Sequence, residues 1–175
     1  QAALLAAVFT LQPWLLRSCR DALGTATPNN WDMMYMLAVL GGPKDLARLR
    51  YVAKEERLEP RRFELLGAYG HPGVVDLLLE AIGGNDPAAA IAAGTAFARI
   101  TGAEIDSSEQ VQLPPEANSE SDEVKEEFLV EAFLPSLALA EKHWNRIRDQ
   151  LSESTRLSHG FDVSGQVLPE VLAEL

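Results

Sequence analysis

Two stretches of this sequence repeat one pattern of apolar residues, glycine and proline at an offset of 29 residues. The aligned positions are Met36–Pro43 with Leu65–Pro72, Leu46 with Val75, Leu49 with Leu78, and Ala53 with Ile82. A third copy begins at residues 97–102. Each copy is typical of a helix, a tight turn and a second helix that begins at proline. A helix pair this short cannot bury its apolar face alone, so we expect neighbouring pairs to stack.

The most specific part of the pattern is the turn at residues 71–75, His-Pro-Gly-Val-Val, followed by the leucines at 77–79. With its copies at 36–53 and 96–102, it resembles the HEAT-repeat class, particularly the short HEAT-like repeats of bacteria. Residues 96–104, followed by an acidic loop and a tryptophan-bearing helix, are similar to an uncharacterised proteobacterial HEAT-like family, and this resemblance covers about residues 31–175. This resemblance implies an all-α fold, a right-handed α-solenoid or superhelix of antiparallel helix pairs, forming a single domain over residues 1–175. It implies no established activity.

The net charge of -11 belongs to one part of the chain. Residues 1–102 contain ten basic and ten acidic residues, whereas residues 103–175 contain five basic and sixteen acidic ones. Ten of those acids lie between Glu104 and Glu131. Because this stretch also contains Pro114-Pro115 and few apolar residues, we expect 104–123 to be a long, acidic, partly disordered loop that interrupts the third helix pair.

After this loop, residues 135–151 are predicted to form a tryptophan-bearing helix that completes the third pair. Its apolar stripe consists of Leu137, Ala140, Trp144, Ile147 and Leu151. Residues 154–167 are polar and contain glycines, which favours a short extended segment, and residues 168–175 resemble the start of another helix.

Composition argues against several classes of partner. An acidic chain with a sequence pI near 4.7 does not favour nucleic acid or an anionic membrane surface. The apolar stretch 2–16 is interrupted by Pro13 and is too short to span a bilayer, so we expect a buried helix there. Cys19 is the only cysteine, which rules out an intrachain disulfide and suits a reducing compartment such as the cytoplasm.

The acidic loop has two functional interpretations besides that of an inert solubilising insertion. Asn118, Glu120 and Asp122 have the spacing of the first three ligands of an EF-hand. Positions six and twelve would then be Glu123 and Leu129 where glycine and glutamate are needed, so we predict no calcium site. The second interpretation is a docking strip for a basic protein partner.

No residue pattern points to catalysis, to a cofactor or to a metal. His71, His143 and His159 lack the spaced His and Cys partners of a zinc site, and His71 is interpreted as a turn residue. Cys19 lies between Arg17 and Arg20, which would lower its thiol pKa, but a buried structural cysteine is the simpler interpretation. The glycine pairs at 41–42 and 83–84 are better explained as helix ends than as phosphate loops.

The second helices of the repeats, residues 43–54 and 72–82, are expected to line the concave face on which helical repeat proteins bind their partners. The residues predicted to face that groove are Lys44, Arg48, Tyr51, Asp76 and Glu80. The competing interpretation is that these side chains only face solvent.

The sequence therefore favours a non-catalytic protein–protein interaction scaffold or adaptor in a bacterial cytoplasm. The alternative is a small-molecule-binding or lyase-like enzyme on a HEAT-like scaffold. That alternative requires a deep pocket that combines His143 and Trp144 with loop carboxylates. DNA binding is disfavoured because no basic groove is apparent in the sequence.

Overall fold

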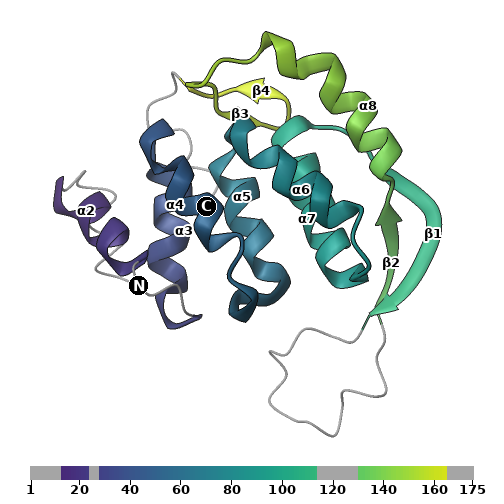
Figure 1. The fold of residues 1–175 in the computed structure, drawn as a ribbon, viewed down its shortest axis with the longest axis horizontal. Helices are drawn as coiled ribbons and strands as arrows, with labels where there is room; N and C mark the ends of the chain where they lie inside the picture. Colours follow the sequence, from purple (N-terminus) through teal and green to yellow (C-terminus); the bar gives the residue numbers. More distant parts are fainter. Residues whose placement is uncertain (1–12, 24–27, 114–129, 165–175) are drawn as a thin grey trace, which may run out of the picture.

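The computed structural model describes residues 13–23, 28–113 and 130–164. In these ranges the chain is mostly helical, with two small antiparallel sheets of two strands each (Figure 1). The expectation of an all-α fold is therefore right for the helices and wrong for the sheets. The helix predicted at 168–175 and most of the apolar stretch 2–16 lie outside the described residues.

The 29-residue repeat is visible in the elements themselves. The helical elements up to residue 101 are α2 (Pro13–Ala22), η2 (Pro28–Asn30), α3 (Trp31–Leu40), η3 (Pro43–Asp45), α4 (Leu46–Val52), η4 (Glu56–Arg61), α5 (Arg62–Tyr69), η5 (Pro72–Val74), α6 (Val75–Ile82) and α7 (Pro87–Thr101). The short turns η3 and η5 both begin at the proline of the repeat, and a second helix follows each. The predicted helix–turn–helix units are confirmed for these two copies.

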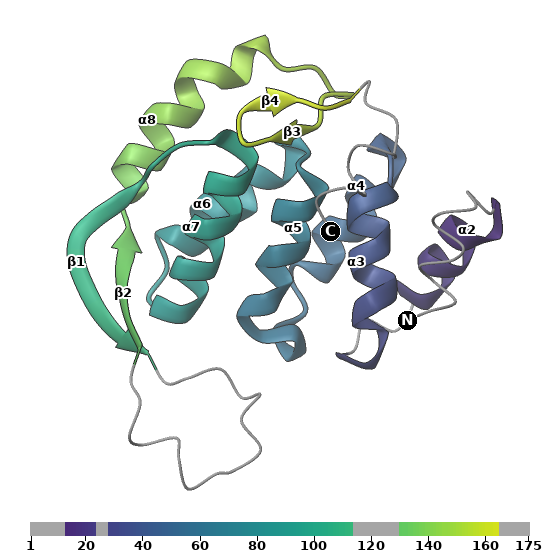
Figure 2. The same ribbon diagram turned by 180° about the vertical axis from the view of Figure 1, so that it is seen from behind.

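The first helices of successive units, α3, α5 and α7, are neighbours in space, and the other helices pack against them. α2 packs on α3, α3 on α5 and α5 on α7, while α4 lies against α5 and α6 against α7 (Figures 1 and 2). The core between them contains fully buried side chains of every unit, among them Leu37, Leu66, Tyr69 and Phe97. α5 and α7 approach closely because Gly67 has no side chain: a Cβ there would lie 3.1 Å from the Cα of Ala96.

The third copy departs from the pattern after α7. Gly102 ends this helix in the left-handed conformation, with φ of 68°, as glycine commonly does at a helix C-terminus. The chain then forms strand β1 (Asp106–Leu113), which pairs antiparallel with β2 (Val130–Pro135). The expected loop at 104–123 is therefore wrong for residues 106–113, and residues 114–129 lie outside the described part.

Alternation explains why this stretch is a strand. β1 and β2 together form a two-stranded ribbon, called the β1–β2 ribbon below. Val111 and Leu113 lie on its half-buried face, while Gln110 and Gln112 are exposed. Val111 pairs with Ala132, so the ribbon has one apolar face to place against α7. A close approach at Gly94 of α7, where a Cβ would lie 2.8 Å from the Cβ of Pro135, seats the ribbon on the helix.

The tryptophan-bearing helix is present, with shifted ends. α8 (Leu137–Ile147) begins after Ser136, whose Oγ accepts a hydrogen bond from the Leu139 amide, so Pro135 ends β2 and does not open the helix. Ala140 is buried, and α8 packs on α6. The chain continues through η7 (Arg148–Gln150) into a small hairpin of β3 (Leu157–Ser158) and β4 (Phe161–Asp162), which confirms the extended segment predicted there.

Candidate functional site

The five residues predicted to line a groove lie on two successive second helices and their turns. Lys44 is in η3, Arg48 and Tyr51 are in α4, and Asp76 and Glu80 are in α6. All five side chains are exposed, and the exposed fraction of Tyr51 reaches 61%. The part of the surface that these residues share is called the α4–α6 surface below.

An ion pair that the sequence analysis missed connects the two helices of this surface. The Arg50 guanidinium donates to both carboxylate oxygens of Asp76, at 2.6 and 2.8 Å, and also to the carbonyl of Gly73. The hydrogen bonds from Arg50 hold the pKa of Asp76 below its ordinary value, although burial opposes them. Asp76 is therefore engaged within the chain, whereas Tyr51 projects into solvent.

The buried carboxylate of Asp45 stabilises the start of α4. Asp45 is fully buried, and its two oxygens accept hydrogen bonds from the Arg20 guanidinium at 2.7 and 2.8 Å. It also accepts from the Gly42 amide at 3.1 Å, and Arg48 lies 3.6 Å away. Burial alone raises the pKa of Asp45, but these hydrogen bonds and the two arginines outweigh burial, so the pKa is lowered. The pair fixes α2 to the start of α4.

Residues 151–163, called the C-terminal clamp below, cross the ends of three helices. The Leu157 amide donates to the carbonyl of Gly70 at 2.7 Å, at the end of α5. The amides of His159 and Gly160 donate to the carbonyls of Arg99 and Ile100, at the end of α7. The last carbonyls of a helix have no partner within the helix, so the clamp supplies the missing donors. Figure 1 shows the β3–β4 hairpin lying over these helix ends.

Arg156 is the centre of the clamp. Its guanidinium donates to five carbonyl oxygens at the ends of α3 and α5, namely those of Ala38, Val39, Gly41, Ala68 and Tyr69, at 2.8–3.2 Å. A cation at the C-terminus of a helix is also stabilised by the helix dipole. Burial lowers the pKa of Arg156, and the nearby Tyr69 opposes this effect. The sequence carries no local signal for this role, because the partners lie 87 or more residues away.

His71 also connects the turn after α5 to the C-terminal clamp. Its Nδ1 accepts a hydrogen bond from the Gly73 amide at 2.9 Å, so the ring proton is on Nε2, which donates to the carbonyl of Glu153 at 2.8 Å. The ring is buried and stacks on Tyr69 with centroids 5.4 Å apart. The interpretation of His71 as a structural turn residue agrees with these contacts.

The other candidate residues are also engaged in packing. Cys19 is a buried free thiol whose pKa is raised by burial, which outweighs the lowering effect of Arg20 that the sequence suggested. His143 packs edge-on against Phe97, and its Nδ1 lies 3.1 Å from the Arg146 guanidinium. Burial is the main cause that lowers the pKa of His143, followed by the charge of Arg146.

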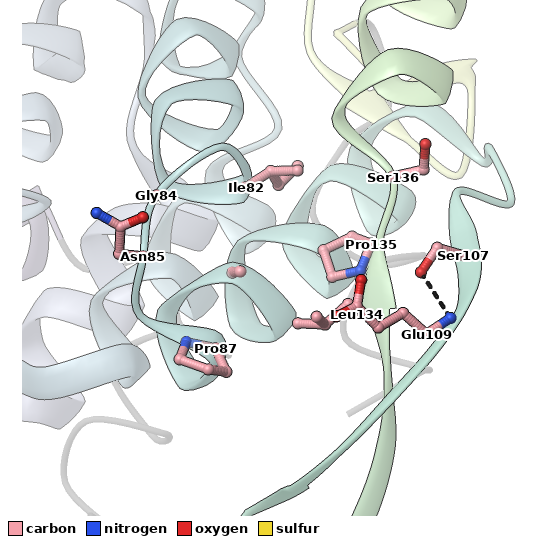
Figure 3. A pocket seen from close by; sticks show the side chains of 10 residues that line it. Ile82, Gly84, Asn85, Pro87, Ser107, Glu109, Leu134, Pro135 and Ser136 are labelled. Carbon is pink, nitrogen blue, oxygen red and sulfur yellow. Dashed lines mark hydrogen bonds between the residues drawn. The ribbon is translucent and has the colours of Figure 1, made fainter.

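A surface pocket lies between the α6–α7 turn and the β1–β2 ribbon (Figure 3). Its volume is about 370 Å³, and Glu109, one of the carboxylates expected in the loop, lines it. His143 and Trp144 are not among its lining residues. This pocket therefore lacks the combination that the enzymatic alternative requires.

Two further features concern metals and membranes. Within residues 13–23, 28–113 and 130–164, no three His, Cys, Asp or Glu side chains gather as metal ligands would. The calcium-like triplet Asn118, Glu120 and Asp122 lies outside these ranges. None of the described helices has the length and apolar character needed to cross a bilayer. Comparison with protein-family models, curated proteins and solved structures gave no match.

Proposed function

We propose that this chain is a non-catalytic protein-binding scaffold or adaptor, and that the α4–α6 surface is where its protein partner binds. The observation that carries the proposal is the placement of Tyr51. It stands 61% exposed on α4, a short helix whose start is held by the buried Asp45–Arg20 ion pair. Tyrosine and arginine are the residues that most often dominate protein interfaces.

The repeated helix pairs support this proposal. α3, α5 and α7 follow one another as neighbours, and the second helices α4 and α6 occupy equivalent places in consecutive units. We interpret this arrangement as a short right-handed HEAT-like solenoid, in which the α4–α6 surface corresponds to the concave binding face of such folds.

The supports beneath the surface make it suitable for recognition. The Arg50–Asp76 ion pair joins the two helices, and the buried Asp45–Arg20 pair holds the start of α4. A surface that is already ordered before binding loses less conformational entropy when a partner docks. The exposed residues of η3, α4 and α6 include charges of both signs, Lys44, Arg48 and Glu80, which favours a partner of complementary pattern.

Affinity capture from a native lysate tests the proposal. The bait would be the intact chain beside a double variant, Arg48→Glu with Tyr51→Ala. A matched control changes one exposed arginine and one exposed aromatic residue on α2: Arg17→Glu with Trp14→Ala. We expect a partner that the wild type and the α2 variant enrich equally and that the α4 variant loses. Enrichment by all three baits, or by none, would contradict the proposal.

A further inference from the structure

The pocket beside the ribbon is formed by an irregularity in β1. Asp106 pairs with Pro135 and the next ladder pair is Gln110 with Phe133, so β1 advances four residues where β2 advances two. The extra residues of β1 leave the ladder, as in a β-bulge, and such bulges commonly redirect side chains next to functional sites. Here two bulged residues, Ser107 and Glu109, line the pocket.

The lining combines apolar walls with one charge. Ile82, Pro87, Leu134 and Pro135 supply apolar surface, and Glu109 is the one charged residue among the described residues of the lining. Figure 3 shows the Glu109 side chain reaching from β1 toward Leu134 and Pro135. In the described part of the chain, no side chain or backbone group forms an ion pair or hydrogen bond with its carboxylate. The carboxylate is therefore available to a ligand.

We propose that this pocket binds an arginine or lysine side chain of the protein partner, a proposal that rests on the scaffold function above and extends it to a second contact. The apolar walls suit the methylene stem of such a side chain, and the Glu109 carboxylate accepts hydrogen bonds from its cationic head.

The charge of the surroundings favours this ligand. The described residues of the ribbon include Asp106, Glu109 and Glu131 and no lysine or arginine, and residues 104–131 contain ten acids and one base. The negative electrostatic potential of these acids attracts a basic segment of a partner toward the ribbon. The nearby N-terminus of α7 would attract an anion, but Asp86 already caps it by accepting from the Ala88 and Ala89 amides at 3.0 and 3.3 Å.

Small probes test the pocket without knowledge of the partner. The probes n-butylguanidinium and n-butylammonium reproduce the ends of the arginine and lysine side chains. The full chain would be titrated with each probe, and binding would be followed by the amide chemical shifts in NMR. The neutral n-butylurea has the same size and serves as the matched probe. We expect the cations to shift the amides of Asn85, Ala90 and Glu109 in a saturable manner, and the urea to leave them unchanged.

Two variants of the chain distinguish binding in the pocket from a general electrostatic attraction of cations to the acidic ribbon. Glu109→Gln should weaken the binding of n-butylguanidinium about threefold to fivefold, as for one exposed charge pair. Glu131→Gln removes the same charge from an exposed position of β2 outside the lining, and should change the affinity less than about twofold.

Equal effects of the two variants would overturn the pocket proposal, because they would show only a diffuse attraction of cations. Saturable shifts at Arg48 and Tyr51 in place of the pocket amides, or an absence of shifts, would overturn it as well. None of these outcomes affects the capture experiment on the α4–α6 surface, so the two proposals fail separately.

Discussion

Replacing Arg156 with methionine removes the group that joins the ends of α3 and α5 to the C-terminal clamp. Methionine fills a similar volume but donates no hydrogen bond, so five carbonyl oxygens lose a cationic donor. After the cost of desolvating a guanidinium, each bond contributes about 0.5–1 kcal/mol. We therefore expect Arg156→Met to lower the free energy of unfolding by about 3–5 kcal/mol.

Urea unfolding followed by circular dichroism measures this loss. With a slope near 2 kcal/mol per molar, the midpoint should fall by about 1.5–2.5 M. Arg156→Lys keeps the charge, but one ammonium with three donors cannot bond both helix ends, so about half of the loss should remain. The matched control is Arg148→Met in η7, just before the clamp, where the exposed Arg148 lies 3.5 Å from Asp149. Its effect should stay within about 0.5 kcal/mol. A loss below about 1 kcal/mol for Arg156→Met, or one equal to that of Arg148→Met, would refute the reasoning.

Three other perturbations test the supports of the fold. Burial favours a higher pKa for Asp45, but its hydrogen bonds and arginine neighbours outweigh burial and hold the folded pKa below its ordinary value. The carboxylate therefore stabilises the fold at a pH above the unfolded pKa of about 3.9. This stabilisation is lost as the pH falls through the lower folded pKa. Asp45→Asn should therefore destabilise the protein by about 2–4 kcal/mol at pH 7, and by less below about pH 4, in urea unfolding. Gly94→Ala places a Cβ 2.8 Å from Pro135 and should cost about 1–3 kcal/mol, whereas Gly42→Ala meets no atom within 4 Å and should be near neutral by thermal melting. Burial raises the pKa of Tyr69 to about 12, so an absorbance titration should contain a late tyrosine component that Tyr69→Phe abolishes; a component unchanged in that variant would contradict its assignment.

The helical part of the fold could be predicted because its signals are local. The prolines at the starts of η3 and η5 fall where the 29-residue repeat places them, and Pro87 after Asp86 is a local signal for the start of α7. The core stripes of α4 and α6 follow the same spacing, and their central residues Leu49 and Leu78 are fully buried.

The ribbon could not be predicted with the same ease, because its stability depends on pairing between distant segments. β1 has only two apolar residues on its inner face, Val111 and Leu113, within a strongly polar stretch. Their alternation with Gln110 and Gln112 is the signal for a strand, but its partner β2 begins at Val130, beyond a long acidic segment. Composition alone favoured a loop.

For the candidate site, sequence reasoning reached the exposed residues but not their supports. The exposure of Lys44, Arg48, Tyr51, Asp76 and Glu80 agrees with positions off the apolar stripes. The bonds of Arg50 to Asp76 and of Arg156 to two helix ends join residues 26 to 118 positions apart. Such pairs depend on the tertiary arrangement, which no local spacing reveals.

Photo-crosslinking at position 51 tests the central claim, that the α4–α6 surface is where a protein partner binds, most directly. Tyr51→p-benzoylphenylalanine would place a reactive group at the exposed position, and the same residue at Thr95, exposed on α7, would serve as the control. Illumination in a native lysate should give one dominant adduct from position 51 that the position-95 variant lacks and that Arg48→Glu suppresses. Equal adducts from both positions, or an adduct from position 51 that Arg48→Glu leaves unchanged, would contradict the account.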